Sequence, residues 1–364
     1  MNLAVANVLQ KKVRSLIAIL AVGIGTALLL VLVGVTRGSI DEVARRIQNV
    51  GGDVIVQQAG ATSFLALKSG ILPERYGDRL RAVPGVAAVS PVVTWTTTFR
   101  NQFYVVYGID PEQFSSIGGG LEMIAGRALR RPGEVVVDSR LAATARLAPG
   151  DRIELLGATF EIVGVSKEGI GARIFLLMSQ LQSMLHQEER VSLFFVRCSS
   201  PAVVKETVAA IEAELPGVRG QLLEGFADQM ARSMSGLEQF ISAITGTTLL
   251  VSLLVVALAM YMTILEKTRE IGILRSLGAS RRLIVGLVVL ESALLTGCGV
   301  VAGYGLTAAA VVALRARYPL LTVEITPAWI LIAGAVGLAS GLLGALYPAW
   351  FAARRDPVEA LSWE

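Results

Sequence analysis

The sequence is poor in the residue types from which catalytic and metal sites are built. It contains a single histidine, His186, and only two cysteines, Cys198 and Cys298. No Ser/His/Asp or Cys/His constellation can be assembled around His186 on sequence grounds. We expect the two cysteines to lie in different parts of the fold, which excludes a disulfide scaffold. The sequence therefore predicts neither a catalytic residue nor a metal site.

The chain also lacks the glycine-rich loop GxxxxGK[ST], with which P-loop proteins hold the phosphates of ATP. We therefore expect this chain to bind no cofactor itself.

Charged residues are scarce for a chain of 364 residues, at 17%, whereas hydrophobic residues make up 53%. The mean hydropathy of +0.62 is too high for an ordinary soluble protein of this length. The formal net charge of +4 comes from Lys and Arg beside apolar runs, without the aromatic interleaving of a nucleic-acid patch. This distribution indicates orientation in a lipid bilayer and not nucleic-acid binding.

Four apolar runs are long enough to cross a hydrocarbon core of about 30 Å. The first has no charge between Arg14 and Arg37, and the basic residues before it predict a cytoplasmic N-terminus. Its length favours a retained anchor over a cleaved signal peptide, whose apolar region is shorter. The predicted segments are an interfacial helix at 1–14, membrane helices at 15–36, 239–265, 283–314 and 328–353, an outer loop at 315–327, and a cytoplasmic tail at 354–364.

The polar stretch 37–238 is predicted to be an α+β extracytoplasmic domain, inserted between the first two membrane helices and ending in a helical stalk. Alternating apolar residues and turn signals predict its elements. Turns are expected at Asn101-Gln102 and, as type II′, at Gly157-Ala158. The predicted strands are Val54–Gln57, Val92–Phe99, Phe103–Ile109, Gly133–Val137, Asp151–Leu156, Thr159–Val165 and Val191–Arg197, and the predicted helices are Pro73–Val83, Ser139–Arg146 and Ala202–Leu215.

A charged helix-turn, EKTREIGILRSLGASRR, lies between the second and third apolar runs at 266–282. Its polar and apolar residues fall on opposite faces of a helix, as expected for a helix at a membrane surface. Gly278 is suited to the left-handed conformation that ends a helix, and Ser280 to the N-cap of the next one. A simpler alternative is that the Lys and Arg residues only orient the chain.

This segment resembles the cytoplasmic coupling segment of the FtsX/MacB-like ABC transporter permeases. The resemblance extends to GEVVVDSRLAATARLAPGDRIELLGATFEIVGV at 133–165 and to YPAWFAARRDPVEALSWE at 347–364. It implies a fold of four membrane helices with a MacB-like extracytoplasmic core domain, and docking of the coupling segment on a separate ATPase subunit. The residues to which it assigns the docking are Glu266, Arg269, Glu270, Gly272, Ile273, Arg275 and Gly278.

Two further features lie inside the apolar runs. Glu291 is the one ionisable residue in the third run, and an unpaired carboxylate in lipid is costly, so its side chain should face protein or water. We expect Glu291 either to act as a hinge or coupling contact or to form a structural hydrogen bond to a neighbouring helix. The second feature is a pair of small-residue spacings, which allow two membrane helices to approach closely. They are formed by Gly299 and Gly303 and by Gly337 and Gly341, and the helices that meet there belong either to one chain or to two.

The resemblance implies the permease half of an ATP-driven machine in a bacterial inner membrane. Its expected action is mechanotransmission, in which the ATPase moves the coupling helix and thereby the outer domain, for export or for extraction of lipids or lipoproteins. The alternative is an FtsX-like regulator that activates an envelope enzyme. The expected partners are the ATPase, which would bind the ATP and Mg, and a second permease subunit in a homo- or heterodimer. An adaptor or membrane fusion protein is a further option.

Overall fold

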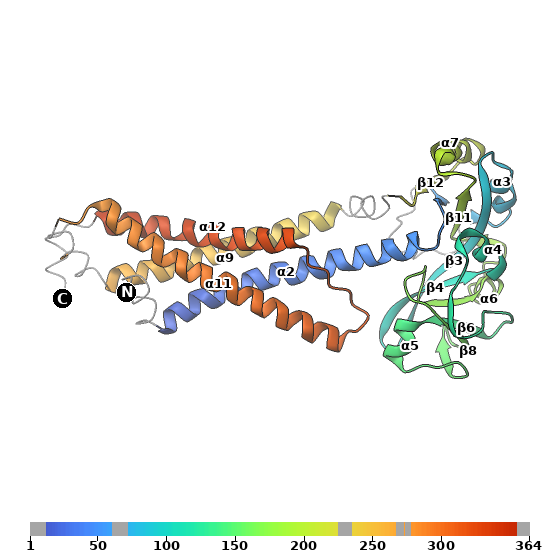
Figure 1. The fold of residues 1–364 in the computed structure, drawn as a ribbon, viewed down its shortest axis with the longest axis horizontal. Coiled ribbons are helices and arrows are strands. Elements are labelled where there is room, and N and C mark those ends of the chain that lie inside the picture. Colours follow the sequence, from blue (N-terminus) through green and yellow to red (C-terminus); the bar gives the residue numbers. More distant parts are fainter. Residues whose placement is uncertain (1–11, 60–71, 225–234, 267–272, 274–277, 355–364) are drawn as a thin grey trace. The chain divides into compact units, whose positions relative to one another are not determined.

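The computed structural model describes residues 12–59, 72–224, 235–266, 273 and 278–354. The chain divides into two compact units. One comprises Met1–Ser39 with Ser235–Glu364, and the other comprises Ile40–Met234. Figure 1 shows the helices and strands of each unit.

Four helices of the described chain are long and apolar enough to cross a membrane. They are α2 (Lys12–Gln48), α9 (Ser235–Glu266), α11 (Arg281–Arg317) and α12 (Pro327–Arg354). Helix α2 continues past the apolar run at 15–36 without interruption as far as Gln48. Its last turns are charged, and the i,i+4 spacing of Glu42 and Arg46 places the two side chains on one face of the helix.

One core cluster of the helical unit draws one or two residues from each of the four helices. Val22, Val256, Leu295, Val300 and Ala345 form a buried apolar cluster. Large apolar side chains elsewhere on these helices are exposed, including Val301 and Leu331, as expected for surfaces that meet lipid. The helices therefore combine an apolar outer surface with a small packed interior.

The second unit is organised around a mixed sheet of ten strands. Its order is β12-β1-β11-β3-β4-β9-β6-β8-β5, with β7 also paired to β8. The pairs β4–β9 and β6–β8 are parallel, and the other pairs are antiparallel. The strands of this sheet are β1 (Val54–Gln58), β3 (Val86–Phe99), β4 (Gln102–Ile109), β5 (Met123–Gly126), β6 (Glu134–Asp138), β7 (Arg152–Leu155), β8 (Ala158–Ser166), β9 (Ile174–Leu177), β11 (Leu193–Cys198) and β12 (Val218–Leu222).

Short helices and a two-stranded sheet complete this unit. Phe114 of one helix contacts Phe175 and Phe195 of the sheet, with ring centroids 6.3 and 6.5 Å away, and all three side chains are fully buried. The remaining elements are α3 (Tyr76–Ala82), α4 (Pro111–Gly118), α5 (Ser139–Ala145), α6 (Met178–Met184), η1 (Pro201–Val203), α7 (Val204–Glu214) and the pair β2 (Leu72–Pro73) and β10 (Arg190–Val191).

Most of the predicted strands and helices are confirmed, with four corrections. The predicted strand Val92–Phe99 begins at Val86, because 86–92 already pairs with β11. The predicted helix Pro73–Val83 begins only at Tyr76, because Pro73 pairs with Arg190 in the small sheet. The β3–β4 turn lies at Arg100 and Asn101, both with positive φ, one residue before the predicted position.

The hairpin between β7 and β8 is also shifted. Leu155 pairs with Ala158, so the turn residues are Leu156 and Gly157, with φ of 53° and 76°. Two successive positive φ angles make a type I′ turn, whereas type II′ was predicted. Glycine supplies one of these angles without cost, and Leu156 adopts the other because the register of the flanking strands requires it.

Candidate functional site: the end of helix α2 and its buried ion network

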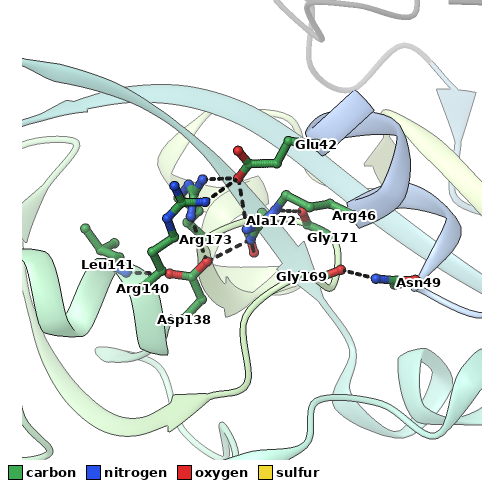
Figure 2. A network of polar contacts seen from close by, with 10 residues as sticks. All are labelled: Glu42, Arg46, Asn49, Asp138, Arg140, Leu141, Gly169, Gly171, Ala172 and Arg173. Carbon is green, nitrogen blue, oxygen red and sulfur yellow. Dashed lines mark hydrogen bonds and ion pairs between the residues drawn. The ribbon is translucent and has the colours of Figure 1, made fainter. Parts of the chain in front are cut away.

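The last turns of α2 carry an arginine that is inserted into the sheet domain. The Arg46 side chain is only 8% exposed, and its Nη2 donates to Asp138 Oδ2 at 3.0 Å. Nη2 also donates to the carbonyl oxygen of Ala172 at 2.6 Å, and Nε donates to that of Gly171 at 2.9 Å. Figure 2 shows these contacts converging on the guanidinium group. The planar fork of arginine is suited to such simultaneous contacts.

Asp138 is the acceptor at the centre of the network. It ends β6 and is the N-cap of α5, where its Oδ1 accepts from the Leu141 main-chain N–H at 2.7 Å. Its Oδ2 also accepts from Arg173 Nη1 at 3.2 Å. The side chain is 1% exposed, so both oxygens of a buried carboxylate are engaged. Asp138 thus ends β6, caps α5 and binds two arginine side chains.

Glu42, one turn before Arg46 on α2, is the second carboxylate. Its Oε1 forms an ion pair with Arg173 Nη2 and lies 3.5 Å from Arg140 Nη1. It also lies 3.9 Å from Arg46 Nη1. Three guanidinium groups therefore share two carboxylates in a largely buried setting. Removing one partner from such a cluster leaves an uncompensated buried charge, which is strongly destabilising.

The end of α2 is held by main-chain contacts as well. The Gly171 N–H donates to the Arg46 carbonyl oxygen at 2.7 Å, and Asn49 Nδ2 donates to the Gly169 carbonyl oxygen at 2.9 Å. Gly171 has a φ of 52°, and a Cβ there would lie 3.0 Å from the Tyr107 ring. Burial raises the pKa of Tyr107 to about 12, so the ring is neutral. Glycine is needed at position 171 for this close approach.

The other end of β6 is held by a second acid. Glu134 accepts from Arg127 Nη2 at 2.6 Å and Nη1 at 2.9 Å, and from the Arg130 N–H at 2.8 Å. The hydrogen bonds from Arg127 lower the pKa of Glu134 to about 2. Between these acids, the three valines of β6 are fully buried. The strand that receives the α2 contacts is thus fixed at both ends.

The predicted coupling residues fall mostly outside the described residues. This applies to Arg269, Glu270, Gly272 and Arg275, while Glu266 is the last residue of α9. Ile273 is described and is 44% exposed. The flanking turn follows the predicted conformations, because Gly278 has a φ of 94° and the Ser280 side chain accepts from the Leu283 N–H. Their role in ATPase binding stays a prediction.

The four predicted packing glycines lie at contacts between helices of this chain. A Cβ on Gly299 would lie 2.7 Å from Val22 Cβ, and one on Gly303 would lie 2.7 Å from Thr26 Cβ. These two glycines therefore bring α11 against α2. On α12, a Cβ on Gly337 would lie 2.7 Å from Val300 Cγ2, and one on Gly341 would overlap Thr296. No side chain larger than hydrogen fits at these positions without movement of the atoms that they contact.

Glu291 is buried in α11, with 5% of its surface exposed. Its neighbour Ser292 donates to the Gly341 carbonyl oxygen of α12 at 2.8 Å. The carboxylate therefore faces protein and not lipid, as the cost of an exposed intramembrane charge requires. Both roles considered for it, coupling contact and structural contact, are compatible with this position.

The five charged residues of the network are not distinguished by the sequence patterns considered above. Two signals could have indicated them. The spacing of Glu42 and Arg46 shows that the first helix can continue beyond its apolar run. An acid between a run of valines and a serine, as at Asp138, is typical of a strand that passes directly into a capped helix.

Comparison with known proteins agrees with this architecture. The model of the MacB-like periplasmic core domain matches residues 15–214, more than half of the chain, and the model of the FtsX-like permease C-terminal region matches residues 242–357. An ABC transporter permease of Mycobacterium tuberculosis is 27% identical, with 94% of each chain covered. The ABC transporter permease YknZ of Bacillus subtilis is 25% identical over all of this chain and 98% of the relative.

The macrolide export ATP-binding/permease protein MacB of Neisseria gonorrhoeae is 26% identical over 99% of this chain, which spans 60% of that protein. Four apolar helices and a domain of the periplasmic MacB type fit a membrane protein with an extracytoplasmic domain. The two family models match one after the other along the chain. The chain belongs to the FtsX/MacB-like family of ABC transporter permeases.

Proposed function

We propose that this permease couples ATP hydrolysis by a separate ABC ATPase subunit to movement of its extracytoplasmic domain. The observation that carries the proposal is α2, which is helical without interruption from Lys12 to Gln48 and ends in the buried network of Glu42, Arg46 and Asp138. A helix is a stiff element, whereas a flexible loop would absorb displacement. A shift of α2 would therefore reach β6 and α5 directly.

Contacts in the helical unit support a path from the coupling segment to α2. Helix α11 starts at Arg281, within the last two residues of the coupling segment at 266–282, and is capped by Ser280. Gly23 of α2 faces α11, since a Cβ there would lie 3.1 Å from the Gly299 carbonyl oxygen. Such backbone-to-backbone approach leaves no compressible side chain between the helices. Displacement of α11 by the ATPase would move α2 with it.

Two further contacts tie α2 to the connection between α11 and α12 and to the first turn of α12. The Glu324 N–H donates to the Gly34 carbonyl oxygen at 3.0 Å, and the Arg37 guanidinium lies 5.3 Å from the Trp329 ring centroid. Helix α2 is therefore held at Gly34 and Arg37 as well as at Gly23, where it contacts α11. This arrangement supports movement of α2 and α11 as one body.

The proposal includes the setting in which this motion acts. The chain lies in a bacterial inner membrane with both termini in the cytoplasm, and it pairs with a second permease subunit, identical or different. The domain motion serves export, or extraction of lipids or lipoproteins, and an adaptor is a further partner. In the FtsX-like alternative, the same motion activates an envelope enzyme.

The coupling assignment can be tested at Gly272. We expect Gly272→Trp to reduce co-purification of the ATPase by about tenfold or more, equal to about 1.4 kcal/mol, because the bulky side chain separates the segment from its partner. Membrane insertion and monodispersity should be unchanged. The measurement is the amount of ATPase retained by the tagged permease in detergent.

Gly286→Trp is the matched control, because position 286 lies on α11 with open space where its Cβ would be. It should retain wild-type ATPase binding. If Gly272→Trp retains full ATPase binding and full ATPase-dependent activity, the segment serves only to orient the chain, and the coupling assignment is wrong.

A further inference from the structure

One end of the helical unit carries three exposed arginines. Arg37 lies on α2, just before that helix enters the sheet domain, and Arg315 and Arg317 lie in the last turn of α11. A second pair, Arg281 and Arg282, begins α11 at its opposite end. Basic residues beside a membrane helix orient it, but only one end of a helix is cytoplasmic. Orientation therefore accounts for one arginine pair of α11 and not for both.

The connection between α11 and α12, residues 318–326, brings Arg315 next to α2. Arg315 Nη2 donates to the Val323 carbonyl oxygen at 3.2 Å. The N–H of the following residue donates to the Gly34 carbonyl oxygen of α2 at 3.0 Å. Gly34 lies about one helical turn before Arg37. The arginines of α2 and α11 thus lie around the same short segment of main chain.

Arg37 is positioned by an aromatic ring. Its guanidinium lies 5.3 Å from the Trp329 ring centroid, and Trp329 packs against the buried cluster of Leu29, Leu30 and Ala333. The face of a ring attracts a cation but accepts no conventional hydrogen bond. Among the described residues, none accepts a hydrogen bond from Arg37 or forms an ion pair with it. Its N–H donors are therefore open to a further partner.

Arg317 has a similar setting at the end of α11. Its guanidinium lies 5.3 Å from the ring centroid of Tyr318, which is 46% exposed. Tryptophan and tyrosine are enriched at the level of lipid headgroups. Neither Arg315 nor Arg317 forms an ion pair within the described part of the chain. Arginines of the sheet domain differ, since Arg46 and Arg127, for example, are paired with carboxylates.

The charge at this end is not balanced by nearby acids. From 315 to 329 the only acid is Glu324, and Asp41 lies one turn beyond Arg37 on α2. Neither acid forms an ion pair with the three arginines in the described structure. Stabilisation of a helix C-terminus by cations applies to the last turn of α11, but Arg37 lies well before the end of α2. These guanidinium groups therefore suit an external anion.

Large apolar side chains are exposed beside these charges. Val312 on α11 is 69% exposed and Leu331 on α12 is 74% exposed, and each lies within about one turn of an arginine or of Trp329. A phospholipid offers both an anionic headgroup and acyl chains, whereas free phosphate offers only the charge. The planar guanidinium group matches phosphate oxygens in two parallel hydrogen bonds. The combination of charges and apolar surface favours a lipid.

We propose that this end of the helical unit binds the headgroup of an anionic phospholipid from the adjoining leaflet. The guanidinium groups of Arg37, Arg315 and Arg317 hold the headgroup phosphate, and the rings of Tyr318 and Trp329 lie beside it at the membrane surface. The acyl chains lie against the apolar surfaces of α11 and α12. This site does not depend on coupling to an ATPase.

The test is quenching of Trp329 fluorescence by phospholipids with brominated acyl chains. The full-length protein, with Trp95, Trp350 and Trp363 replaced by Phe, is reconstituted in phosphatidylcholine. A small share of the lipid is brominated phosphatidylglycerol in one sample and brominated phosphatidylcholine in the other. We expect phosphatidylglycerol to associate near Trp329 about fivefold more strongly or better, the attraction typical of one basic residue at an anionic surface.

The preference should be lost when Arg37→Gln, Arg315→Gln and Arg317→Gln are combined. Arg281→Gln with Arg282→Gln is the matched control, because it removes charge from the opposite end of α11. This control should keep the preference at Trp329. Quenching by brominated phosphatidylcholine should be equal in all variants, which shows that Trp329 keeps its place in the folded protein.

The proposal is overturned if the two brominated lipids quench Trp329 equally when all arginines are present, a comparison that needs no arginine variant to fold. It is also overturned if the triple variant keeps the preference. Equal loss in the control pair would attribute the binding to the net charge of the protein and would equally contradict the proposal. Inorganic phosphate in excess should leave the preference in place. Its disappearance would identify free phosphate, and not a lipid, as the ligand.

Discussion

Asp138→Ala is expected to destabilise the sheet domain by about 3–5 kcal/mol, the loss typical of breaking a buried ion pair. The reason is that Arg46 and Arg173 would both lose a carboxylate that is only 1% exposed, and α5 would lose its N-cap. Glu42 alone would then face three guanidinium groups. The measurement is chemical or thermal unfolding of the purified full-length protein, followed by a probe in the sheet domain.

Asp110→Ala measures the contribution of capping alone, because Asp110 has the same N-cap role at α4 and forms no ion pair with a described residue. Its expected loss is about 1 kcal/mol. Asp138→Asn keeps the cap but removes the charge, and it should fall between the two. Equal losses for Asp138→Ala and Asp110→Ala would show that the buried network contributes nothing beyond the cap.

Gly303→Leu is expected to prevent normal packing of α11 on α2. The new Cβ would lie 2.7 Å from Thr26 Cβ and 2.8 Å from the Gly23 carbonyl oxygen, and a main-chain atom cannot move aside as a side chain can. We expect a loss at the upper end of about 1–3 kcal/mol for an overpacked interior. The readouts are the unfolding temperature in detergent and the fraction of monodisperse protein.

Gly305→Leu provides the comparison on the same helix, since a Cβ at position 305 has nothing within 4 Å. It should retain the unfolding temperature and yield of the wild type, because its side chain points away from the packed interior. If both variants are equally destabilised, the effect comes from leucine in the helix and not from the contact with α2, and the proposed joint movement of these helices loses its basis.

The membrane helices could be predicted because each depends on a local property of the sequence. An apolar run of sufficient length between Lys and Arg residues specifies a helix whatever its neighbours are. The N-cap at Ser280 and the left-handed conformation of Gly278 could also be predicted, since both depend on adjacent residues. The continuation of α2 to Gln48 was less accessible. The Glu42–Arg46 spacing permits a longer helix, but the charged turns are stabilised by partners in a distant part of the chain.

The network itself joins residues that are far apart in sequence. Arg46 reaches Asp138 and Ala172, and Arg173 reaches Glu42. With 33 Lys and Arg and 29 Asp and Glu residues in the chain, no charge pattern selects this set from the alternatives. The same applies to the packing glycines. Their spacing indicated close contacts, but only the structure identifies Val22, Thr26 and Thr296 as the partners.

The central claim is that the nucleotide state of the ATPase changes the position of the extracytoplasmic domain through α2. The most direct test is the distance between spin labels at Glu154 in the sheet domain and Leu250 on α9, a helix that is not part of the α2–α11 body. Both positions are exposed. The labels are placed in a Cys298→Ser background, which removes the exposed native thiol, and the permease is reconstituted in nanodiscs with its ATPase. Labelled chains are diluted with unlabelled ones.

We predict that the distance distribution differs between the nucleotide-free and ATP-bound states, and that Asp138→Asn reduces this difference while ATP turnover persists. The reduction follows because the variant weakens the contact between α2 and the domain without touching the ATPase. An unchanged distribution in every nucleotide state of the wild-type complex would contradict the account.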